Sequence, residues 1–503
     1  MKKYIATIIT FSLLLNACKT DDLELSNGSG VSAETFPQTL AELQQTMNGV
    51  YSPLQSQGLY GRYLFYMYDY MGDDCQTQRG TPDLLEFINY TFTSSNNDIY
   101  LYWKNAYNGI SRANFILDKE ANINELEESV ASQEVKDRYI GQAKFLRAYY
   151  YFLLVERFGD IPLYTTTNVS PNGLAKSPKE EVYDLIISDL TDAATKLRLK
   201  SSEEAGRVTQ GSANALLGKL YLYKQEYALA KVAFDKVINS GEYSLMANYY
   251  DNFNVETENN AESVFEIQFT YDGGNAWAYA DWGGQDNGHS ETTFRSAEYG
   301  AFGGFHNNDP SQELLDEYED GDSRFSDNFY VEGDVYGIGG ANIVTADQVG
   351  SVSALWRKYT KTYGQDNSNY NGLSDINHRA IRYADVLLMA AEVENELNNS
   401  QTAIDYLNEV RDRVNMPNYG TDEMNTTFPV STKAEIFSAV VHERRVELAG
   451  EQSRFPDLMR WGLIEDVLGS KFNASKNYLL PIPQGEFDTN LMLDASADQN
   501  PGY

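Results

Sequence analysis

Two tryptophans stand in a stretch whose composition suits binding better than packing. Trp277 and Trp282 lie between two Gly-Gly pairs, at 273–274 and 283–284, and polar residues surround them. A tryptophan in a glycine-rich stretch has few neighbours that could bury its ring. An exposed indole ring there is therefore better explained by ligand binding than by core packing. A flat indole ring can stack on the apolar C–H face of a sugar, and polar side chains beside it can bind the sugar hydroxyls. The alternative is a loop tucked under the rest of the chain.

Hydrogen-bonding groups flank the two indoles in the same segment. The four candidates are Asn275, Tyr279, Asp281 and Gln285. Amide, carboxylate and hydroxyl groups of this kind bind hydroxyls without charge selectivity. The other three tryptophans, Trp103, Trp356 and Trp461, lie in stretches typical of helices or scaffold and are predicted to pack in the core.

The sequence gives no recognisable catalytic or metal motif. Glycoside hydrolysis needs two carboxylates at a defined separation, and no glycosidase motif frames such a pair among the 73 acidic residues. The run from His442 to Val446 begins like the zinc motif H-E-x-x-H but lacks its second histidine. We therefore predict no catalytic residues, no metal and no cofactor.

The formal net charge is −34, with 39 basic against 73 acidic residues. Such a surface repels phosphate backbones and polyanionic polysaccharides, which disfavours nucleic acid and favours neutral glycans as partners. The acidity is equally compatible with a protein that is simply kept soluble in salty surroundings.

The first 17 residues are typical of an export signal. Lys2 and Lys3 precede an apolar stretch from Ile5 to Leu15, which is too short for a membrane span of ~20 residues. The following run, 15–18, resembles a bacterial lipobox that ends at Cys18, although Asn16 is not the usual small residue. We predict a signal peptide at 1–17, lipidation of Cys18 and a polar tether at 18–35. An ordinary signal peptide with an incidental cysteine is the alternative.

The chain has too few cysteines for an internal disulfide if Cys18 is lipidated. Besides Cys18 the chain has only Cys75, which has no partner once Cys18 is lipidated. Stability must then come from burial, for which some 485 residues suffice.

Helical periodicity dominates the rest of the chain. Apolar residues recur at helical spacing from Asp137 to Phe158, and the following glycine and proline end the helix. Ser177 and Pro178, followed by acidic residues, predict a second helix with Ser177 as its cap.

Two segments have the spacing of a tetratricopeptide repeat, in which small residues let paired helices approach and large apolar ones fill the seam. The first, 212–239, contains Leu217, Gly218, Tyr221, Ala230, Phe234 and Val237. The second, 387–411, contains Ala390, Ala391, Ala403, Leu407 and Val410, with Glu394 where the tyrosine would stand. They predict a helical-repeat lobe.

Two other regions are predicted to be loop-rich. Residues 244–375 are rich in glycine, asparagine and aromatics, with a strand-like run at 264–269. Residues 58–98 are crowded with tyrosines and polar residues. Long loops within a compact protein are usually functional.

Five phrases in order along the chain resemble the SusD/RagB family of nutrient-binding lipoproteins of Bacteroidetes. They are AKFLRAYYYF at 143–152, FGDIP at 158–162, RYADVLLMAAE at 382–392, ERRVEL with DLMRWG at 443–462, and YLLPIP with NPGY in the tail. The short run after Cys18 also resembles the surface-export signal of such lipoproteins.

The resemblance implies a mostly α-helical fold in one domain, 36–503, with halves at about 36–240 and 260–503. Four tetratricopeptide-like helix pairs would form a scaffold, and a loop-rich lobe would carry the ligand site. It also implies a lipid-anchored protein of the outer membrane surface that captures oligosaccharide, without cutting it, for a SusC-like TonB-dependent transporter. A neutral β-glucan such as laminarin is the expected substrate. A peptide-binding transporter partner and a surface glycoside hydrolase are the alternatives.

The N-terminal half of this family often contributes to the ligand site. The resemblance thus makes Asp74 and Arg79 the candidates in the first loop-rich region. Solvated loop charges are the alternative for both residues.

Overall fold

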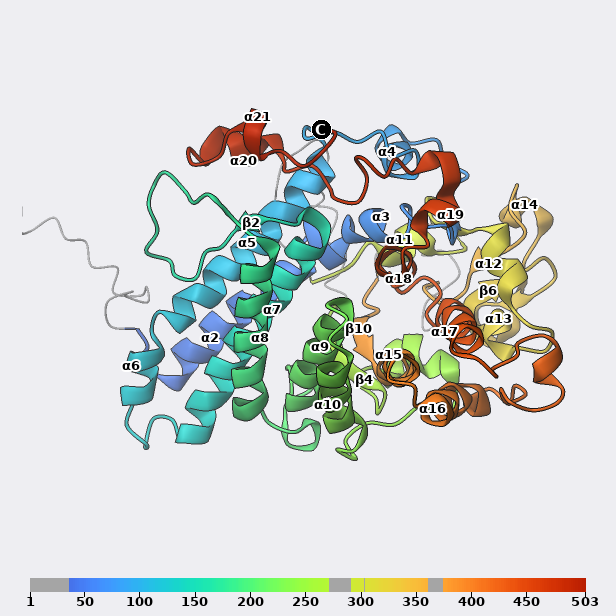
Figure 1. Ribbon diagram of the computed structural model, residues 1–503, viewed down its shortest axis with the longest axis horizontal. Helices are drawn as coiled ribbons and strands as arrows, with labels where there is room; N and C mark the ends of the chain where they lie inside the picture. Colours follow the sequence, from blue (N-terminus) through green and yellow to red (C-terminus); the bar gives the residue numbers. More distant parts are fainter. Residues whose placement is uncertain (1–35, 271–290, 303, 361–373) are drawn as a thin grey trace, which may run out of the picture.

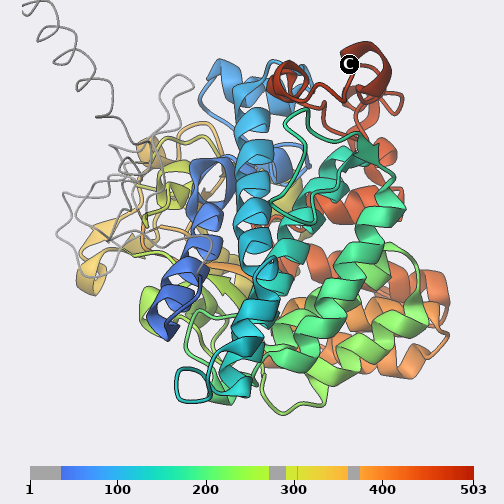
Figure 2. The same ribbon diagram turned by 90° about the vertical axis from the view of Figure 1, so that its left-hand side faces the viewer.

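The structure is a computed structural model that describes residues 36–270, 291–302, 304–360 and 374–503. The described chain is mostly helical, as predicted. Four long helices form the N-terminal side: α2 (Leu40–Tyr51), α5 (Asn97–Leu117), α7 (Gln133–Phe158) and α8 (Lys179–Lys196). They pack side by side on the left of Figure 1, and Figure 2 shows the same helices from that side.

Helix α7 confirms the predicted helix and adds one turn to its start. The side chain of Ser132 caps its N-terminus by accepting from the backbone N–H of Val135. Gly159 ends it with a φ of 71°, in the left-handed region that favours glycine. Tyrosines and phenylalanines are buried on nearly every side of this helix, so α7 is the central element of the N-terminal half.

The predicted cap of α8 is wrong by one residue. Ser177 belongs to strand β3 (Lys176–Ser177), and the cap position falls on Pro178, whose side chain offers no acceptor. Instead Asp160, in the turn after α7, accepts a 2.8 Å hydrogen bond from the backbone N–H of Lys179. A carboxylate from a distant turn therefore replaces the local serine.

The first predicted repeat forms the packed helices α9 (Gln210–Tyr223) and α10 (Tyr227–Ile238). The second forms α15 (Tyr383–Glu396) and α16 (Ser400–Arg413). Glu394, at the unusual position of the second repeat, is buried and forms an ion pair with Lys231 of α10. This ion pair joins the two helix pairs, which stand next to each other in Figure 1. The expected total of four tetratricopeptide-like pairs stays a prediction.

The remaining described helices are mostly short. They are α3 (Leu64–Tyr68), α4 (Pro82–Ile88), α6 (Glu120–Glu125), α11 (Arg295–Tyr299), α12 (Gln312–Glu317), α13 (Ser323–Asn328), α14 (Ala346–Val349), α17 (Lys433–Glu447), α18 (Arg454–Trp461), α19 (Ile464–Leu468), α20 (Gln484–Thr489) and α21 (Ala495–Asp498). A π-helical turn, η4 (Gln57–Gly61), precedes α3.

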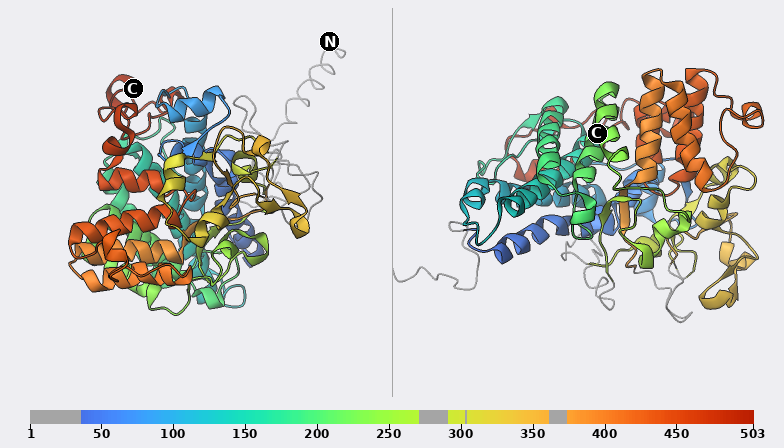
Figure 3. Two further views of the ribbon diagram at one scale, coloured as in Figure 1. Left: turned by 90° about the vertical axis from the view of Figure 1, so that its right-hand side faces the viewer. Right: turned by 90° about the horizontal axis from the view of Figure 1, so that it is seen from below.

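Strands are few and pair antiparallel within the described residues. The pairs are β1 (Cys75–Gln76) with β5 (Asp309–Pro310), β2 (Ile161–Pro162) with β3, β4 (Ser263–Ile267) with β10 (His378–Arg382), β6 (Phe329–Tyr330) with β9 (Leu355–Trp356), and β7 (Val335–Tyr336) with β8 (Asn342–Ile343). Strand β4 confirms the predicted strand-like run. Figure 3 (left) shows the yellow segment around α12 to α14 on the opposite side of the view from the orange helices α15 and α16.

The tyrosine-rich region 58–98 is not the open loop that its composition suggested. It contains η4, α3 and α4, and all five tyrosines between positions 60 and 70 are buried. Tyr60 shares a hydrogen bond with Tyr149 of α7, and Tyr68 one with Tyr102 of α5. These rings pack the central helices together and are not available as surface platforms for a ligand.

The main hydrophobic core contains buried residues of both halves, from Phe36 to Ile482. The C-terminal segment returns to the N-terminal helices, since Trp103 of α5 donates a 2.9 Å hydrogen bond to Glu486 of α20. Trp103 and Trp356 are buried, as predicted, and Trp461 is half-buried. Within the described ranges, every helix is too short or too polar to cross a membrane.

Candidate ligand-binding sites

The predicted tryptophan site lies outside the described residues. This applies to Trp277, Trp282 and the four polar candidates near them, Asn275, Tyr279, Asp281 and Gln285. The residues on either side of segment 271–290 are described, however. The backbone N–H of Thr270 donates a 2.7 Å hydrogen bond to the carbonyl of Glu291, which brings the two ends of the segment together.

The point where segment 271–290 joins the described chain is fixed by backbone hydrogen bonds. Thr293 and Ser374 exchange two of them, each 2.9 Å long. The next residue, Phe294, donates a 2.9 Å hydrogen bond to the carbonyl of Gly61 at the end of η4. The segment is therefore attached beside the turn that leads from η4 into α3.

Arginine and aromatic side chains gather next to this attachment point. The guanidinium of Arg62 lies 5.2 Å from the ring centre of Phe294 and 6.0 Å from that of Phe305. Arg79 covers the same Phe305 ring at 5.1 Å. Because Glu298 binds Arg62 at 2.7 Å, the charge of Arg62 is compensated inside the protein.

Arg79 itself is exposed, and no carboxylate lies within ion-pair distance of it among the described residues. Its loop is held by the backbone N–H of Gln78, which donates to the carbonyl of His306 at 3.3 Å. The structure thus brings Arg79 to the surface beside a half-buried phenylalanine. A guanidinium there can donate several hydrogen bonds to a ligand.

Asp74, the second candidate of that loop, lies in the interior. It is 5% exposed, and its carboxylate accepts a 2.8 Å hydrogen bond from Arg445 of α17. Burial raises the pKa of Asp74, against the effect of the nearby Arg445. Its neighbour Asp73 binds both Arg445 and Arg454. In this structure Asp74 ties strand β1 to the C-terminal half.

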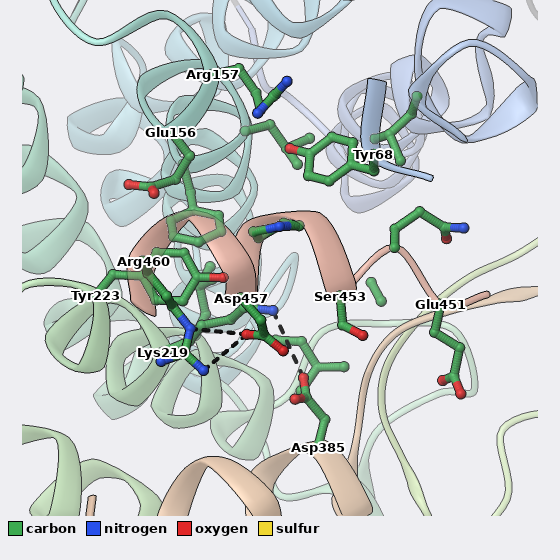
Figure 4. Close-up of a pocket in the computed structure, with 18 of the residues that line it drawn as sticks. Tyr68, Glu156, Arg157, Lys219, Tyr223, Asp385, Glu451, Ser453, Asp457 and Arg460 are labelled. Atoms are coloured by element: carbon green, nitrogen blue, oxygen red, sulfur yellow. Dashed lines mark hydrogen bonds and ion pairs between the residues drawn. The ribbon is translucent and has the colours of Figure 1, made fainter. Parts of the chain in front are cut away.

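A cavity of about 360 Å³ lies between the two halves. Figure 4 shows its walls: Glu156 and Arg157 come from α7, Lys219 and Tyr223 from α9, Asp385 from α15, and Asp457 and Arg460 from α18. Tyr68 of α3 and residues of β10 complete the interior end. Lys179 and Met459 are only partly buried and Tyr478 is exposed, so the cavity reaches the surface beside them.

Basic residues outnumber acidic ones on the cavity wall. The basic side chains are those of Arg157, Lys179, Lys219, Arg379, Arg382, Arg444 and Arg460, and the acidic ones those of Glu156, Asp385, Glu451 and Asp457. The whole chain has the opposite ratio, 39 to 73. The wall itself therefore has the reverse ratio, although Arg379, Arg382 and Arg460 also bind carboxylates that lie behind it.

Most of these charges are paired, either within the wall or with carboxylates behind it. Arg444 binds Asp385 at 2.8 Å and Asp457 at 2.7 Å. Arg460 also binds Asp457, at 2.9 Å. Burial opposes the charged form of Asp385, but Lys219 and Arg444 hold its pKa below the ordinary value. These pairs join α15, α17 and α18 around the lower part of the cavity in Figure 4.

Sequence reasoning did not single out this cavity. Arg444 and Asp457 belong to the phrases that resemble the SusD/RagB family, which predict scaffold and not a binding site. The sequence predicts Arg157 only as part of a helix. One local signal points to Arg157. It is a charged residue in α7, a helix whose tyrosines and leucines are buried on nearly every side. Nothing in the sequence around Arg157 indicates that its side chain packs against α18, which follows about 300 residues later in the chain.

Comparison with known proteins gives the family. Residues 23–222 match a family described as "Starch-binding associating with outer membrane", and residues 234–476 match the SusD family. SusD-like protein P2 of Formosa agariphila is 30% identical over the whole of both chains. The chain belongs to the SusD family.

Solved structures of the SusD superfamily share the fold. A SusD superfamily protein from Bacteroides vulgatus is 26% identical with a TM-score of 0.76, and the match covers 92% of this chain and 99% of that one. A laminarin-binding SusD-like protein is 27% identical with a TM-score of 0.72, and covers 93% and 100%. The mostly helical fold expected for a SusD protein is thereby confirmed.

Proposed function

We propose that this SusD-family protein captures a neutral glycan at the cell surface and passes it, uncut, to a SusC-like TonB-dependent transporter. The observation that carries the proposal is the attachment of segment 271–290 beside Arg62, Phe294 and Phe305. Two phenylalanine rings and the guanidinium groups of Arg62 and Arg79 lie close to where the C-terminal end of the tryptophan segment joins the described chain. Trp277 and Trp282 would add the stacking surfaces that a sugar ring needs.

A neutral β-glucan such as laminarin is the proposed substrate. The laminarin-binding SusD-like protein of the same fold supports this choice. So does the net charge of −34, which repels acidic polysaccharides at low and moderate ionic strength. Asn275, Tyr279, Asp281, Gln285 and the exposed Arg79 are proposed to bind the sugar hydroxyls.

The protein would act as a binding partner at the outer membrane. Acyl chains on Cys18 are proposed to anchor it there through the tether 18–35, since more than one acyl chain gives stable attachment. Replacing Cys18 by serine should then abolish incorporation of labelled palmitate and move the protein out of the membrane fraction.

Affinity electrophoresis in gels that contain laminarin, alginate or starch tests the glycan proposal. Laminarin should retard the wild type, and alginate should not. Trp277→Ala and Trp282→Ala should each reduce the retardation, since each removes a stacking surface worth about 1 kcal/mol or more. Leu491→Ala removes an exposed apolar side chain from the C-terminal segment and should change nothing.

Three results would contradict the proposal. Equal retardation of the wild type and both tryptophan variants would remove these residues from the site. Binding of peptide mixtures in calorimetry, with no retardation by any glycan, would replace the glycan by a peptide. Sustained release of reducing ends from laminarin by the pure protein would contradict the non-catalytic role.

A further inference from the structure

Arg157 is a buried cation whose charge has no partner in the described part of the chain. It is 3% exposed, yet no carboxylate lies within ion-pair distance of it. Its guanidinium stacks on the ring of Phe455 at 4.5 Å and donates at 3.2 Å to the carbonyl of Met67. The Nε atom, which is itself buried, donates no hydrogen bond to any described residue. Burial of an unpaired charge is costly, and proteins normally pair such groups.

The cavity offers space for the missing partner. Arg157 lines its upper part in Figure 4, together with Tyr68 and Glu156. The volume of about 360 Å³ lies in the lower part of the range of ~300–1,000 Å³ that small-molecule sites usually have. A guanidinium prefers a planar carboxylate, which accepts two parallel hydrogen bonds from it.

A second unpaired cation lies at the mouth of the cavity. Lys179, at the start of α8, is half-buried, and its ammonium lies 4.9 Å from the ring centre of Tyr183. It forms no ion pair among the described residues. Lys219 reaches Asp385 only at 3.8 Å. An anion that enters past Lys179 thus meets one cation without an ion pair at the rim and another, Arg157, in the interior, in a protein that is otherwise strongly acidic.

Polar groups on the wall would bind hydroxyls of the same ligand. Glu156 accepts from the hydroxyl of Tyr183 and has a second oxygen available. Tyr223 and Ser453 also line the cavity, and the ring of Tyr223 offers an apolar face. We propose that this cavity binds a small organic acid of monosaccharide size, with its carboxylate on Arg157 and its hydroxyls on the opposite wall.

This site is separate from the proposed glycan site. The cavity opens among α7, α8, α9 and α18, and only its interior end, at Tyr60, reaches η4, where segment 271–290 is attached. The two ligands also differ in charge, because the surface favours a neutral polymer and the cavity a small anion. Either proposal can fail without the other.

Titration calorimetry with sodium D-glucuronate tests the inference, and D-glucose serves as the neutral ligand of the same ring size. The wild type should bind glucuronate and show no heat with glucose at the same concentration. Arg157→Lys should weaken binding about tenfold or more, because a lysine keeps the charge but lacks the two-pronged geometry. Lys179→Gln should weaken it about threefold to tenfold by removing charge at the mouth.

Matched controls separate the site from general effects of charge and from the glycan site. Lys236→Gln on α10 removes one exposed charge outside the cavity and should leave glucuronate affinity unchanged. Trp277→Ala should also leave it unchanged, and laminarin should not compete. Circular dichroism establishes that each variant is folded, and if Arg157→Lys does not fold, Lys179→Gln decides. Equal binding of glucose and glucuronate, absence of binding by the wild type, or undiminished binding by folded Lys179→Gln would overturn the proposal.

Discussion

Gly218 of α9 and Phe234 of α10 touch so closely that no side chain fits between them. A Cβ on Gly218 would lie 2.5 Å from Cε1 of the Phe234 ring, which is fully buried. Gly218→Ala should therefore lower the free energy of unfolding by about 1–3 kcal/mol, although alanine by itself favours a helix by ~1 kcal/mol. Urea denaturation measures this change.

Gly49 of α2 provides the matched control. A Cβ there would meet no atom within 4 Å. Gly49→Ala should keep the helix-propensity gain and stabilise the protein by up to ~1 kcal/mol. A Gly218→Ala variant as stable as Gly49→Ala would show that the two helices can move apart freely.

Arg324 is fully buried among carboxylates that belong to different elements. It binds Asp322 at 2.7 Å and Glu447 of α17 at 3.0 Å. Arg324→Met leaves these carboxylates less compensated and should cost about 3–5 kcal/mol of stability. Arg198→Met breaks a partly exposed pair with Glu134 and should cost less than ~1 kcal/mol. Thermal unfolding compares the two variants, and similar losses would argue against an essential buried network.

His442 gives the fold a dependence on alkaline pH. Its two ring nitrogens lie 2.6 Å from Glu317 and 3.3 Å from Glu319. Burial opposes the charged ring, but hydrogen bonds to these carboxylates raise the pKa of His442 to about 9 from its ordinary 6.5. A raised pKa stabilises the folded state fully below pH 6.5, and this contribution is lost as the pH rises to 9. It amounts to roughly 2–3 kcal/mol.

The difference between the wild type and His442→Gln isolates this effect. Lys358 also titrates in this range, since burial lowers its pKa to about 8, and its contribution changes with pH in the opposite direction. Denaturation at pH 6 and pH 9 should show a smaller advantage of the wild type over His442→Gln at pH 9. A constant difference would contradict the assigned charge state.

Asp74 should matter for stability more than an ordinary surface acid does. Asp74→Asn removes the carboxylate that binds Arg445 and should cost about 1–3 kcal/mol. Glu332→Gln changes an exposed acid by the same charge and should stay within ~0.5 kcal/mol of the wild type. Chemical denaturation is the measurement, and a stable Asp74→Asn variant would leave this residue free for a role in binding.

Arg79 should matter for binding and not for stability. Its side chain is exposed and contacts only the face of Phe305 among the described residues. Arg79→Ala should weaken retention by laminarin about tenfold, because hydrogen bonds from a charged donor contribute ~1.5–3 kcal/mol. The midpoint of thermal unfolding should not move. Unchanged retention would place the ligand elsewhere on this face.

Local pattern was enough to find the helices that carry their own periodicity. The helix ending at Phe158 and the pairs around Gly218 and Ala390 follow from spacing and from small residues at close contacts, which are properties of neighbouring positions. The cap of α8 was wrong because Asp160, a residue outside the local motif, supplied the hydrogen bond. The tyrosines near position 66 were misjudged because burial depends on helices far along the chain.

The helical class, the family and the chemistry of the candidate surface residues therefore follow from the amino-acid sequence alone. Only the tertiary structure decided that Asp74 is an internal anchor while Arg79 reaches the surface. It also brings Arg157 and Asp457 to one cavity. The physical reason is that burial and electrostatic pairing join residues hundreds of positions apart, and no short-range pattern records which of them will meet.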